Sequence, residues 1–529
     1  MKRVSFFRLN GRMTNAALEK GRLVKNKTQY AFTASNYWSS TEYNSNNAWN
    51  VNFNNGNINN NNKYNEMNVR PVAALDEKRK EAWIDSFDDC CRHKKTSDNC
   101  IRYRLRYEED LFRLATEVES GVYRPSTSVC FCVTRPKLRE VFAANFRDRI
   151  VHHWLMLKLN PLFEERFIGQ GNVSFNCRKN FGVLAAVNKV RDDIAVVSGG
   201  YTQDAYVGRF DLVGFFMSID KAILIAKLRD FVYANYHEED VDLVFKTLCT
   251  VIMHNPSRDC EIHGKEQLFG RLPRNKSLFF VPDGKGLPIG NLTSQIFANF
   301  YLSFFDEVMV EWTHTRGGRY ERFVDDFVVI MPEMKMVQEA YTFAREYLSR
   351  ELKVALHDDK KYMQHYTKGI AFVGYVIKVD RVYLSNRTFG HMDDKMRTIE
   401  RKCATIDRRE RKVADFWKLN RAVQSINSFT GFSVHTNGYA KRTKILFKYK
   451  KIYNFAFFKR NKHVLRMRTK FKIGEILYEK DKLDRSRLSA YLHGETQCGT
   501  VAADALRGCR TYDTGRRRRH RRRVVSSAH

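Results

Sequence analysis

Two adjacent aspartates, Asp325 and Asp326, interrupt a stretch of apolar and aromatic residues that runs from Arg319 to Met331. The flanks have the composition of two short strands, and Val324 to Asp326 is the expected tight turn between them. Adjacent carboxylates repel each other, so the arrangement is costly unless a cation lies between them. The pattern predicts a hairpin tip that presents carboxylates to a metal ion, although a solvated turn would use the same residues because Asp is common in turns.

A third acid, Asp211, is embedded in the segment from Tyr206 to Phe216, which predicts a buried strand. A lone carboxylate in such a strand is costly without a partner or a metal ion, unless it lies at an exposed strand end. Together the three acids suit two divalent ions about 3.5–4 Å apart, which activate an attacking hydroxyl and stabilise a leaving pyrophosphate. Asp211 and Asp325 are expected to bridge both ions, with Asp326 in support. Oxygen ligands favour Mg²⁺, and no His and Cys set competes with them.

A Gly/Pro-rich loop, from Gly286 to Gln295, precedes a predicted buried helix between these acids. Such a loop at a helix N-terminus suits a phosphate or a nucleotide, although loops of this kind also serve only to turn the chain. Two rows of apolar residues with a four-residue step indicate that the helix is buried on both faces. These rows are Ile296, Phe300, Phe304 and Val308, and Phe297, Tyr301, Phe305 and Met309.

The remaining elements are expected to be mostly helical before Tyr206 and mixed after it. Helices are predicted at 110–120, at 150–159 (ended by Asn160 and Pro161) and at 337–352. A strand followed by a turn is predicted at 174–182, and an apolar strand with a turn at 371–377.

The formal net charge is +33, which indicates a polyanionic partner, most simply nucleic acid. Residues 397–472 hold 22 Lys and Arg against 4 Asp and Glu, and 516–523 add seven Arg. Aromatic residues are interleaved in the first segment, so it is expected to fold and to present a basic face to a phosphate backbone. No apolar run approaches the roughly 20 residues of a membrane span, and 11 irregularly spaced Cys argue for reduced thiols in a cytosolic setting.

The sequence resembles reverse transcriptases over about residues 76 to 385. The residues from Phe323 to Asp326 match the aromatic-x-Asp-Asp motif of that family, and Phe210 with Asp211 matches its first metal-binding motif. The resemblance implies an α+β right-hand polymerase, with helical fingers and thumb and a small antiparallel palm sheet. It implies catalysis by Asp211, Asp325 and Asp326, and two Mg²⁺ ions, for which Mn²⁺ can substitute, at Asp211, Leu212, Asp325 and Asp326.

The same resemblance assigns further residues. Phe216 corresponds to the aromatic gate that selects deoxynucleotides, Arg178 to the fingers residue that meets the triphosphate, and Lys360 or Lys361 to the basic residue of the next motif. The remaining implied nucleotide-binding residues are Ile289, Gly290 and Gln295. The implied primer grip comprises Phe372, Gly374 and Tyr375, within a Phe-Val-Gly-Tyr hairpin.

The loop before the buried helix suggests a subfamily. Most relatives have Gln-Gly-x-x-x-Ser-Pro there, whereas this chain has Ile289-Gly290-Asn291-Leu292-Thr293-Ser294-Gln295, a form similar to that of reverse transcriptases of diversity-generating retroelements. Ile289 cannot make the hydrogen bonds of a Gln, and a site with fewer fixed polar contacts discriminates less well. Reduced fidelity is therefore expected. The resemblance also implies an RNA template, a DNA or RNA primer, dNTPs and a small, basic, helical accessory protein that forms a ring, in the cytoplasm of a bacterium, encoded by the bacterium or a phage.

Residues 1–75 differ in composition from the rest, with 14 Asn among the 25 residues of 44–68. Asn at this density suits neither a helix nor a central strand. The block from Tyr37 to Ala74 resembles the variable end of a lectin-fold target protein as encoded by a template repeat. One interpretation is template-repeat sequence that is translated in frame with the polymerase. Another is that translation starts near residue 75, so that the block is not a functional domain. A polar binding module is the third reading.

The expected domains are thus residues 1–75, fingers and palm at 76–384, a basic thumb at 385–480 and an Arg-rich tail, expected to be disordered, at 481–529. Zinc at Cys90, Cys91, His93 and Cys100 is disfavoured because an adjacent Cys pair is poor spacing for one site. Two alternatives stay open: a group II intron-like or retron reverse transcriptase of ordinary fidelity, and a nucleic-acid-binding protein without activity.

Overall fold

The structure is a computed structural model that describes residues 36–42, 47–52, 58–62, 77–92, 94, 97–134, 137–405, 413–461 and 464–469. The chain divides into two compact units, Met1–Ser385 and Asn386–His529. Helices predominate, and the sheets are small and largely antiparallel. No described helix has the length and apolar character that crossing a membrane requires.

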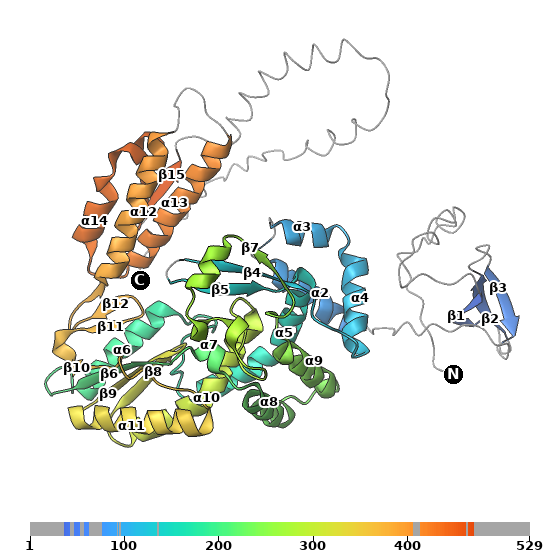
Figure 1. Cartoon of the computed structure of the whole chain (residues 1–529), viewed down its shortest axis with the longest axis horizontal. Coiled ribbons are helices and arrows are strands. Elements are labelled where there is room, and N and C mark those ends of the chain that lie inside the picture. Colours follow the sequence, from blue (N-terminus) through green and yellow to red (C-terminus); the bar gives the residue numbers. More distant parts are fainter. Residues whose placement is uncertain are drawn as a thin grey trace, which may run out of the picture. The chain divides into compact units, whose positions relative to one another are not determined.

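The first unit contains a four-stranded antiparallel sheet, here called the central sheet, with helices on both of its sides (Figure 1). Its strand order is β10 (Tyr362–His365), β6 (Tyr206–Asp211), β9 (Asp326–Met331) and β8 (Arg319–Phe323). Helices α6 (Val183–Val197), α10 (Leu292–His314) and α11 (Met334–Glu351) pack against it. All residues of β9 after Asp326 are fully buried, which fits a strand covered on both faces.

Several predicted elements are confirmed here. The expected hairpin is β8 and β9, the buried helix after the Gly/Pro-rich loop is α10, and the helix predicted at 337–352 is α11. The predicted strand from Tyr206 to Phe216 is wrong beyond Asp211. Gly214 has a φ of 52° and turns the chain into the short helix α7 (Phe215–Ser218). An added Cβ at Gly214 would lie 2.6 Å from the carbonyl oxygen of Asn275, so that position requires glycine.

Helices α2 (Glu77–Cys91), α3 (Asp98–Arg104), α4 (Tyr107–Glu119), α5 (Phe146–Gly169), α8 (Lys221–Asn235) and α9 (Val241–Met253) share one core with the sheet. The prediction at 110–120 is confirmed as α4. The predicted helix end at Pro161 is wrong, because α5 continues through it to Gly169. Pro161 is exposed, as is Leu157 one turn earlier, so the carbonyl that loses its amide partner there is on the solvent side.

Two of the three-stranded sheets described in the first unit follow the Asn-rich N-terminal block. One contains β4 (Ser128–Val133) between β5 (Arg139–Ala143) and β7 (Cys260–His263), with β7 parallel to β4. Three 3₁₀ turns follow β7: η1 (Glu266–Arg271), η2 (Arg274–Lys276) and η3 (Leu278–Phe280). The other sheet is β11 (Ile370–Phe372), β12 (Tyr375–Ile377) and β13 (Val382–Leu384), which confirms the strand and turn predicted at 371–377.

The second unit contains α12 (Asn386–Ala404), α13 (Val413–Ser433), α14 (Tyr439–Lys448), η5 (Lys450–Asn454) and the hairpin of β14 (Ala456–Asn461) and β15 (Val464–Thr469). Buried residues from all three helices, including Met396, Ile426 and Leu446, form its core. The Arg-rich tail from 481 onwards lies outside the described residues.

In the Asn-rich N-terminal block, a meander of three antiparallel strands is described: β1 (Asn36–Glu42), β2 (Asn47–Asn52) and β3 (Ile58–Asn62). The expectation that dense Asn excludes a central strand is wrong, because β2, which contains three Asn, lies between the other two. The rest of residues 1–75 lies outside the described residues.

Candidate active site

The register of the central sheet brings the three predicted acids together. Asp211, the last residue of β6, is directly opposite Asp326, the first residue of β9. Residues that face each other in an antiparallel pair have Cβ atoms about 4.5–5.5 Å apart. Asp325 lies in the hairpin turn, and its carbonyl oxygen accepts a hydrogen bond from the amide of Leu212 at 3.3 Å. Acids separated by more than 110 residues in the sequence therefore meet at one end of the sheet.

The turn that carries Asp325 is strained. Only Val324 and Asp325 lie between β8 and β9, and Val324 has a φ of 60°. A β-branched residue in the left-handed region is a conformational outlier, and such strain is held only where the surroundings fix it. The carboxylate position is thus set by the surrounding fold.

The acids share an electrostatically unfavourable environment. Burial raises the pKa of Asp325, and the charge of Asp211 adds to this effect. Burial also raises the pKa of Asp326 to about 6, although the nearby Arg209 opposes the shift. Two cations partly neutralise the group: Lys360 Nζ lies 3.1 Å from Asp211 Oδ2, and Arg209 Nε lies 3.2 Å from Asp326 Oδ1. The site therefore favours added positive charge.

The donor set fits a hard divalent cation. All three side chains offer carboxylate oxygens, which Mg²⁺ prefers, and Asp326 Oδ1 is buried without accepting a hydrogen bond from any described residue. Within the described part of the chain, however, no three His, Cys, Asp or Glu side chains are gathered closely enough to hold an ion as they stand. Lys360 and Arg209 hold two of the carboxylates instead. A metal ion at these carboxylates would require both ion pairs to open.

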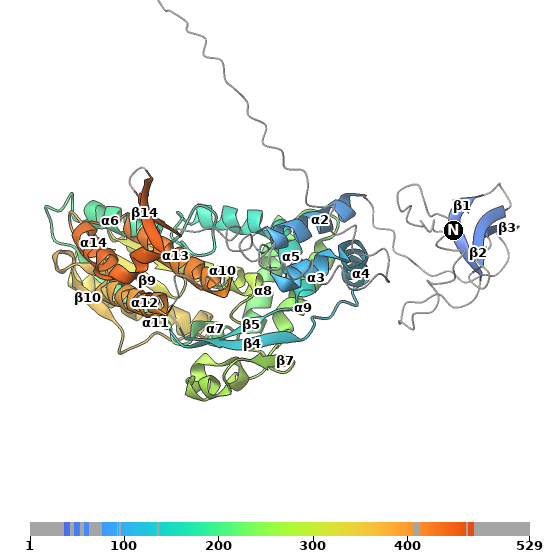
Figure 2. The same ribbon diagram turned by 90° about the horizontal axis from the view of Figure 1, so that it is seen from above.

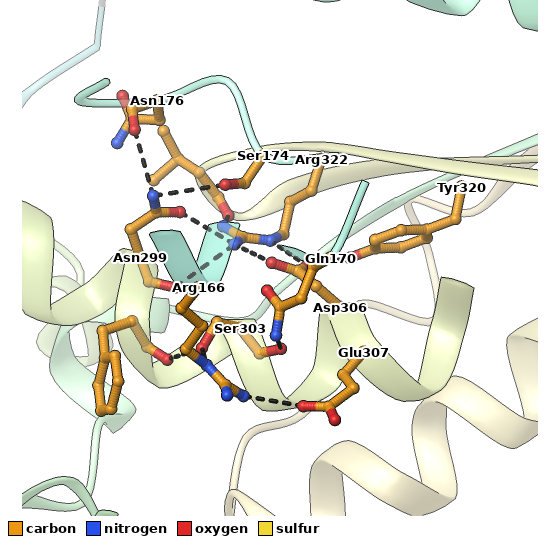
Figure 3. A network of polar contacts seen from close by, with 12 residues as sticks. Arg166, Gln170, Ser174, Asn176, Asn299, Ser303, Asp306, Glu307, Tyr320 and Arg322 are labelled. Carbon is orange, nitrogen blue, oxygen red and sulfur yellow. Dashed lines mark hydrogen bonds and ion pairs between the residues drawn. The ribbon is translucent and has the colours of Figure 1, made fainter. Parts of the chain in front are cut away.

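A buried polar network connects the β8–β9 hairpin to helix α10 (Figure 3). The Arg322 side chain is 1% exposed and its partner Asp306 is completely buried. The guanidinium donates Nε to Asp306 Oδ1 at 2.6 Å and Nη1 to the carbonyl oxygen of Val324 at 2.9 Å. Tyr320 donates its hydroxyl to the same Asp306 oxygen at 2.7 Å. Arg322 therefore ties helix α10 directly to the strained turn.

The network extends to the segment before Arg178. Arg322 Nη2 donates to Asn299 Oδ1 at 2.9 Å, and Asn299 Nδ2 contacts the carbonyl oxygen of Asn176 at 3.3 Å (Figure 3). The amide of Arg322 donates to the carbonyl oxygen of Val173 at 2.8 Å. Sequence reasoning missed this network. An acid at position 306 inside a helix predicted to be buried was the available signal, because such an acid needs a cationic partner.

Arg178 is not free to meet a ligand in this arrangement. Its side chain donates to Glu164 and to Asn172, and its guanidinium lies 3.9 Å from the ring centroid of Phe181. Contact with a triphosphate would require it to leave these partners. Phe216, by contrast, is half-buried and is the second residue of the short helix α7, which follows the strand that ends in Asp211.

The loop before α10 is packed tightly against β5. The carbonyl oxygen of Ile289 accepts a hydrogen bond from the amide of Phe142 at 2.7 Å. Gly290 has a φ of 129°, and a Cβ there would lie 2.5 Å from the carbonyl oxygen of Phe142. Gln295 is exposed, with its Oε1 2.9 Å from Cys177 Sγ. Gly290 is thus required by a close backbone approach.

The predicted primer-grip residues lie at the tip of the β11–β12 hairpin, where Phe372 ends β11, Gly374 is in the turn and Tyr375 begins β12. Phe372 and Tyr375 are each 1% exposed, so their rings belong to the core, and Gly374 has a φ of 89°. A link missed by sequence reasoning joins this hairpin to the acids: Arg209, which pairs with Asp326, also donates to the carbonyl oxygen of Ala371.

The disfavoured zinc residues do not form a described site. The Sγ atoms of Cys91 and Cys100 lie 3.3 Å apart, and burial raises the pKa of Cys90 to about 11 and that of Cys91 to about 12. His93 lies outside the described residues.

No family model matches the chain. Protein YkfC of Escherichia coli strain K12 is 24% identical over 307 residues, which cover 52% of this chain and 72% of that protein. Among solved structures, apo telomerase from Candida tropicalis gives a TM-score of 0.39 at 10% identity and covers 62% of this chain. Telomerase from Candida albicans in complex with a fragment of telomeric RNA gives 0.36 at 11% identity and covers 66%. The chain spans 60% of the length of each of these telomerase chains.

Proposed function

We propose that this chain is an RNA-directed DNA polymerase with a fingers, palm and thumb organisation. The observation that carries the proposal is the meeting of Asp211, Asp325 and Asp326 at the end of a buried antiparallel sheet. These three carboxylates lie in an environment that favours added positive charge, and the turn that carries Asp325 is held by the buried pair of Arg322 and Asp306. The net charge of +33 supplies the attraction to a nucleic-acid substrate.

Asp211, Asp325 and Asp326, with Leu212 beside them, would hold two Mg²⁺ ions, or Mn²⁺ in their place. Such ions supply charge neutralisation for the attacking 3′-hydroxyl and the leaving pyrophosphate. The chain's own residues position the reactants. Lys360 and Arg209 pair with Asp211 and Asp326 in the structure, and they would be free to contact substrate phosphates if these carboxylates held cations instead.

The nucleotide would lie against Phe216, Ile289, Gly290 and Gln295. Phe216 follows the Gly214 turn directly, and the carbonyl oxygen of Phe216 accepts a hydrogen bond from the amide of Leu287 at 2.8 Å. The gate residue and the loop before α10 are therefore held together by the backbone. A bulky ring at this position would exclude a ribose 2′-hydroxyl and select dNTPs.

The finer proposal is that the enzyme copies a template-repeat RNA into cDNA with errors at adenines, as reverse transcriptases of diversity-generating retroelements do. It rests on Ile289, which is apolar where most relatives have Gln, and on the Asn-rich N-terminal block. A small, basic, ring-forming accessory protein and a bacterial cytoplasm belong to the same proposal. We expect Ile289→Gln to lower the error rate opposite adenine, because a Gln restores polar contacts to the nucleotide or template.

One observation favours a second candidate, a nucleic-acid-binding protein without activity. Lys360 and Arg209 already pair with Asp211 and Asp326, and the described side chains gather no ready-made metal site. An inactive relative that kept the fold would tolerate such internal ion pairs permanently.

The test is DNA synthesis on a primed RNA template that contains adenines, with Mg²⁺, followed by sequencing of the products. The control is the Asp325→Ala, Asp326→Ala protein, and accessory protein is both omitted and added. Synthesis by the wild type alone, with errors concentrated opposite adenine, supports both levels of the proposal. Faithful cDNA would support the polymerase activity and contradict the mutagenic role. An unchanged error spectrum in Ile289→Gln would contradict the link between Ile289 and fidelity.

A further inference from the structure

Two adjacent phenylalanines project from the 3₁₀ turns that follow β7. Phe280 is 52% exposed and Phe279 is 37% exposed. The Arg274 guanidinium lies 4.6 Å from the centroid of the Phe280 ring. We name Arg274, Phe279 and Phe280 the aromatic patch. Large exposed apolar side chains that gather beside a cation mark binding surfaces more often than isolated ones do.

The aromatic patch is held firmly by the residues just before it. The buried carboxylate of Glu140 accepts hydrogen bonds from the amide of Leu278 and from the Ser277 hydroxyl, the latter at 2.8 Å. The Leu278 side chain is buried in a small core with Phe142 and Met217. The two rings that follow are therefore presented to solvent by an anchored turn, and their exposure does not come from a loose loop.

The aromatic patch adjoins both loops of the candidate active site. The Phe279 ring lies 5.6 Å from that of Phe142, whose amide donates to Ile289 in the loop before α10. On the other side, the carbonyl oxygen of Asn275 closes over Gly214, which precedes Phe216. Figure 2 shows β5, β4 and β7 side by side, and the contacts to Glu140 and Phe142 place this segment against β5. A strand that leaves the nucleotide site past Ile289 would reach the two rings.

The charge of the segment matches a phosphate backbone. Between 271 and 280 there are three basic residues, Arg271, Arg274 and Lys276, and no acid. All three are exposed, and none forms an ion pair with a residue that the structure describes. Exposed cations that form no ion pair with a described residue, together with exposed rings, are a combination that binds single-stranded nucleic acid.

Resting on the proposed function, we infer that the aromatic patch binds the unpaired bases of the template ahead of the nucleotide site. Aromatic rings stack on bases whose faces are open, and a duplex hides those faces inside its stack. Phe280, with Arg274 beside it, takes an unpaired base, and Arg271 and Lys276 contact the phosphates. Because every base has a π-face, this contact does not depend on template sequence, as copying requires.

The experiment compares two labelled RNA–DNA primer–template duplexes that differ only in a 5′ single-stranded template overhang of about ten nucleotides, a length within the range that one single-strand-binding module covers. Binding of the full chain is followed by fluorescence anisotropy, and primer extension is measured on the overhang substrate. The variants are Phe280→Ala and Arg274→Gln. Tyr233→Ala, which removes a 46% exposed aromatic ring from α8, is the matched control.

Wild type and the control are expected to bind the overhang substrate more tightly than the blunt one. Phe280→Ala is expected to lose about five- to 150-fold of that preference, the range for one stacked base, while blunt binding stays unchanged. An unchanged overhang preference in Phe280→Ala, or an equal loss on both substrates, overturns the inference. Binding does not require catalysis, so the two proposals can fail separately. If Phe280→Ala loses the overhang preference but the wild type never extends the primer, the aromatic patch stands and the polymerase proposal fails. If the wild type extends the primer but Phe280→Ala keeps the overhang preference, the polymerase proposal stands and the aromatic patch fails.

Discussion

Replacing Arg322 by Met tests whether the buried network holds the hairpin that carries Asp325 and Asp326. Met has similar length and no charge, so the change removes the guanidinium and leaves most of the packing. Asp306 would remain completely buried with only the Tyr320 hydroxyl as a described donor to its carboxylate. The carbonyl oxygen of Val324 would lose the donor that holds the strained turn.

The expected cost follows from this burial. Breaking a buried ion pair by removing one partner costs about 3–5 kcal/mol, because a charge is left without compensation. Arg322→Met should therefore lower the free energy of unfolding of the first unit by about 3–5 kcal/mol, a large share of the roughly 5–15 kcal/mol typical of a domain. The double variant Arg322→Met, Asp306→Leu should regain part of this loss, since it removes both charges.

Urea unfolding followed by circular dichroism measures the change, and primer extension of the same proteins measures the effect on the site. The matched control is Arg316→Met, since Arg316 is exposed and its guanidinium lies over Trp312. Surface changes of this kind stay within about 1 kcal/mol. The network does not hold the hairpin if Arg322→Met is as stable as the control. The same holds if the double variant loses as much free energy of unfolding as Arg322→Met and Asp306→Leu lose together as single variants.

Three further outcomes are expected. Val324→Gly should leave the free energy of unfolding unchanged or raise it by up to about 1 kcal/mol in urea unfolding, because the φ of 60° ceases to be strained. Val328→Gly, in the buried strand, should instead lower the free energy of unfolding by about 2–5 kcal/mol. Burial lowers the pKa of His152 to about 3, so the folded state keeps this ring neutral while the unfolded state takes up a proton below about pH 6.5. The free energy of unfolding should therefore fall by about 2 kcal/mol from this group between pH 6.5 and 5. His152→Gln should lose about 2 kcal/mol less than the wild type over that range in pH-dependent unfolding. Phe216→Ala should raise incorporation of ribonucleotides relative to deoxynucleotides in single-nucleotide assays, and an unchanged ratio would count against the gate.

The acid pair and its hairpin were predictable because their signals are local. Two short apolar runs flank Asp325 and Asp326, and a two-residue turn between them is the simplest solution. The strand that carries Asp211 was predictable as far as that residue, whereas its end was not. The chain turns at Gly214 because the Asn275 backbone lies there, and that contact comes from more than 60 residues away.

The supporting shell of the site could not be predicted from spacing. Arg322 meets Asp306 only because β8 packs on α10, and Arg209 reaches both Asp326 and Ala371 only in the assembled sheets. A pattern records which residues share a face, whereas these contacts depend on how separate elements cross. Helix α5 passes through Pro161 for a related reason, since exposure and tertiary packing outweigh a local breaker.

The most direct test of the two-metal site is single-nucleotide addition to a primer on an RNA template as Mg²⁺ is raised, in the wild type, Asp211→Asn and Asp326→Asn. The Asn variants keep the size of each side chain and remove its charge. The wild type is expected to extend the primer and release pyrophosphate, and both variants to lose about a thousandfold or more of that rate while they bind the primed template normally. Extension that survives in either variant, or a wild type that binds the primed template and never extends it, would contradict the assignment of these acids.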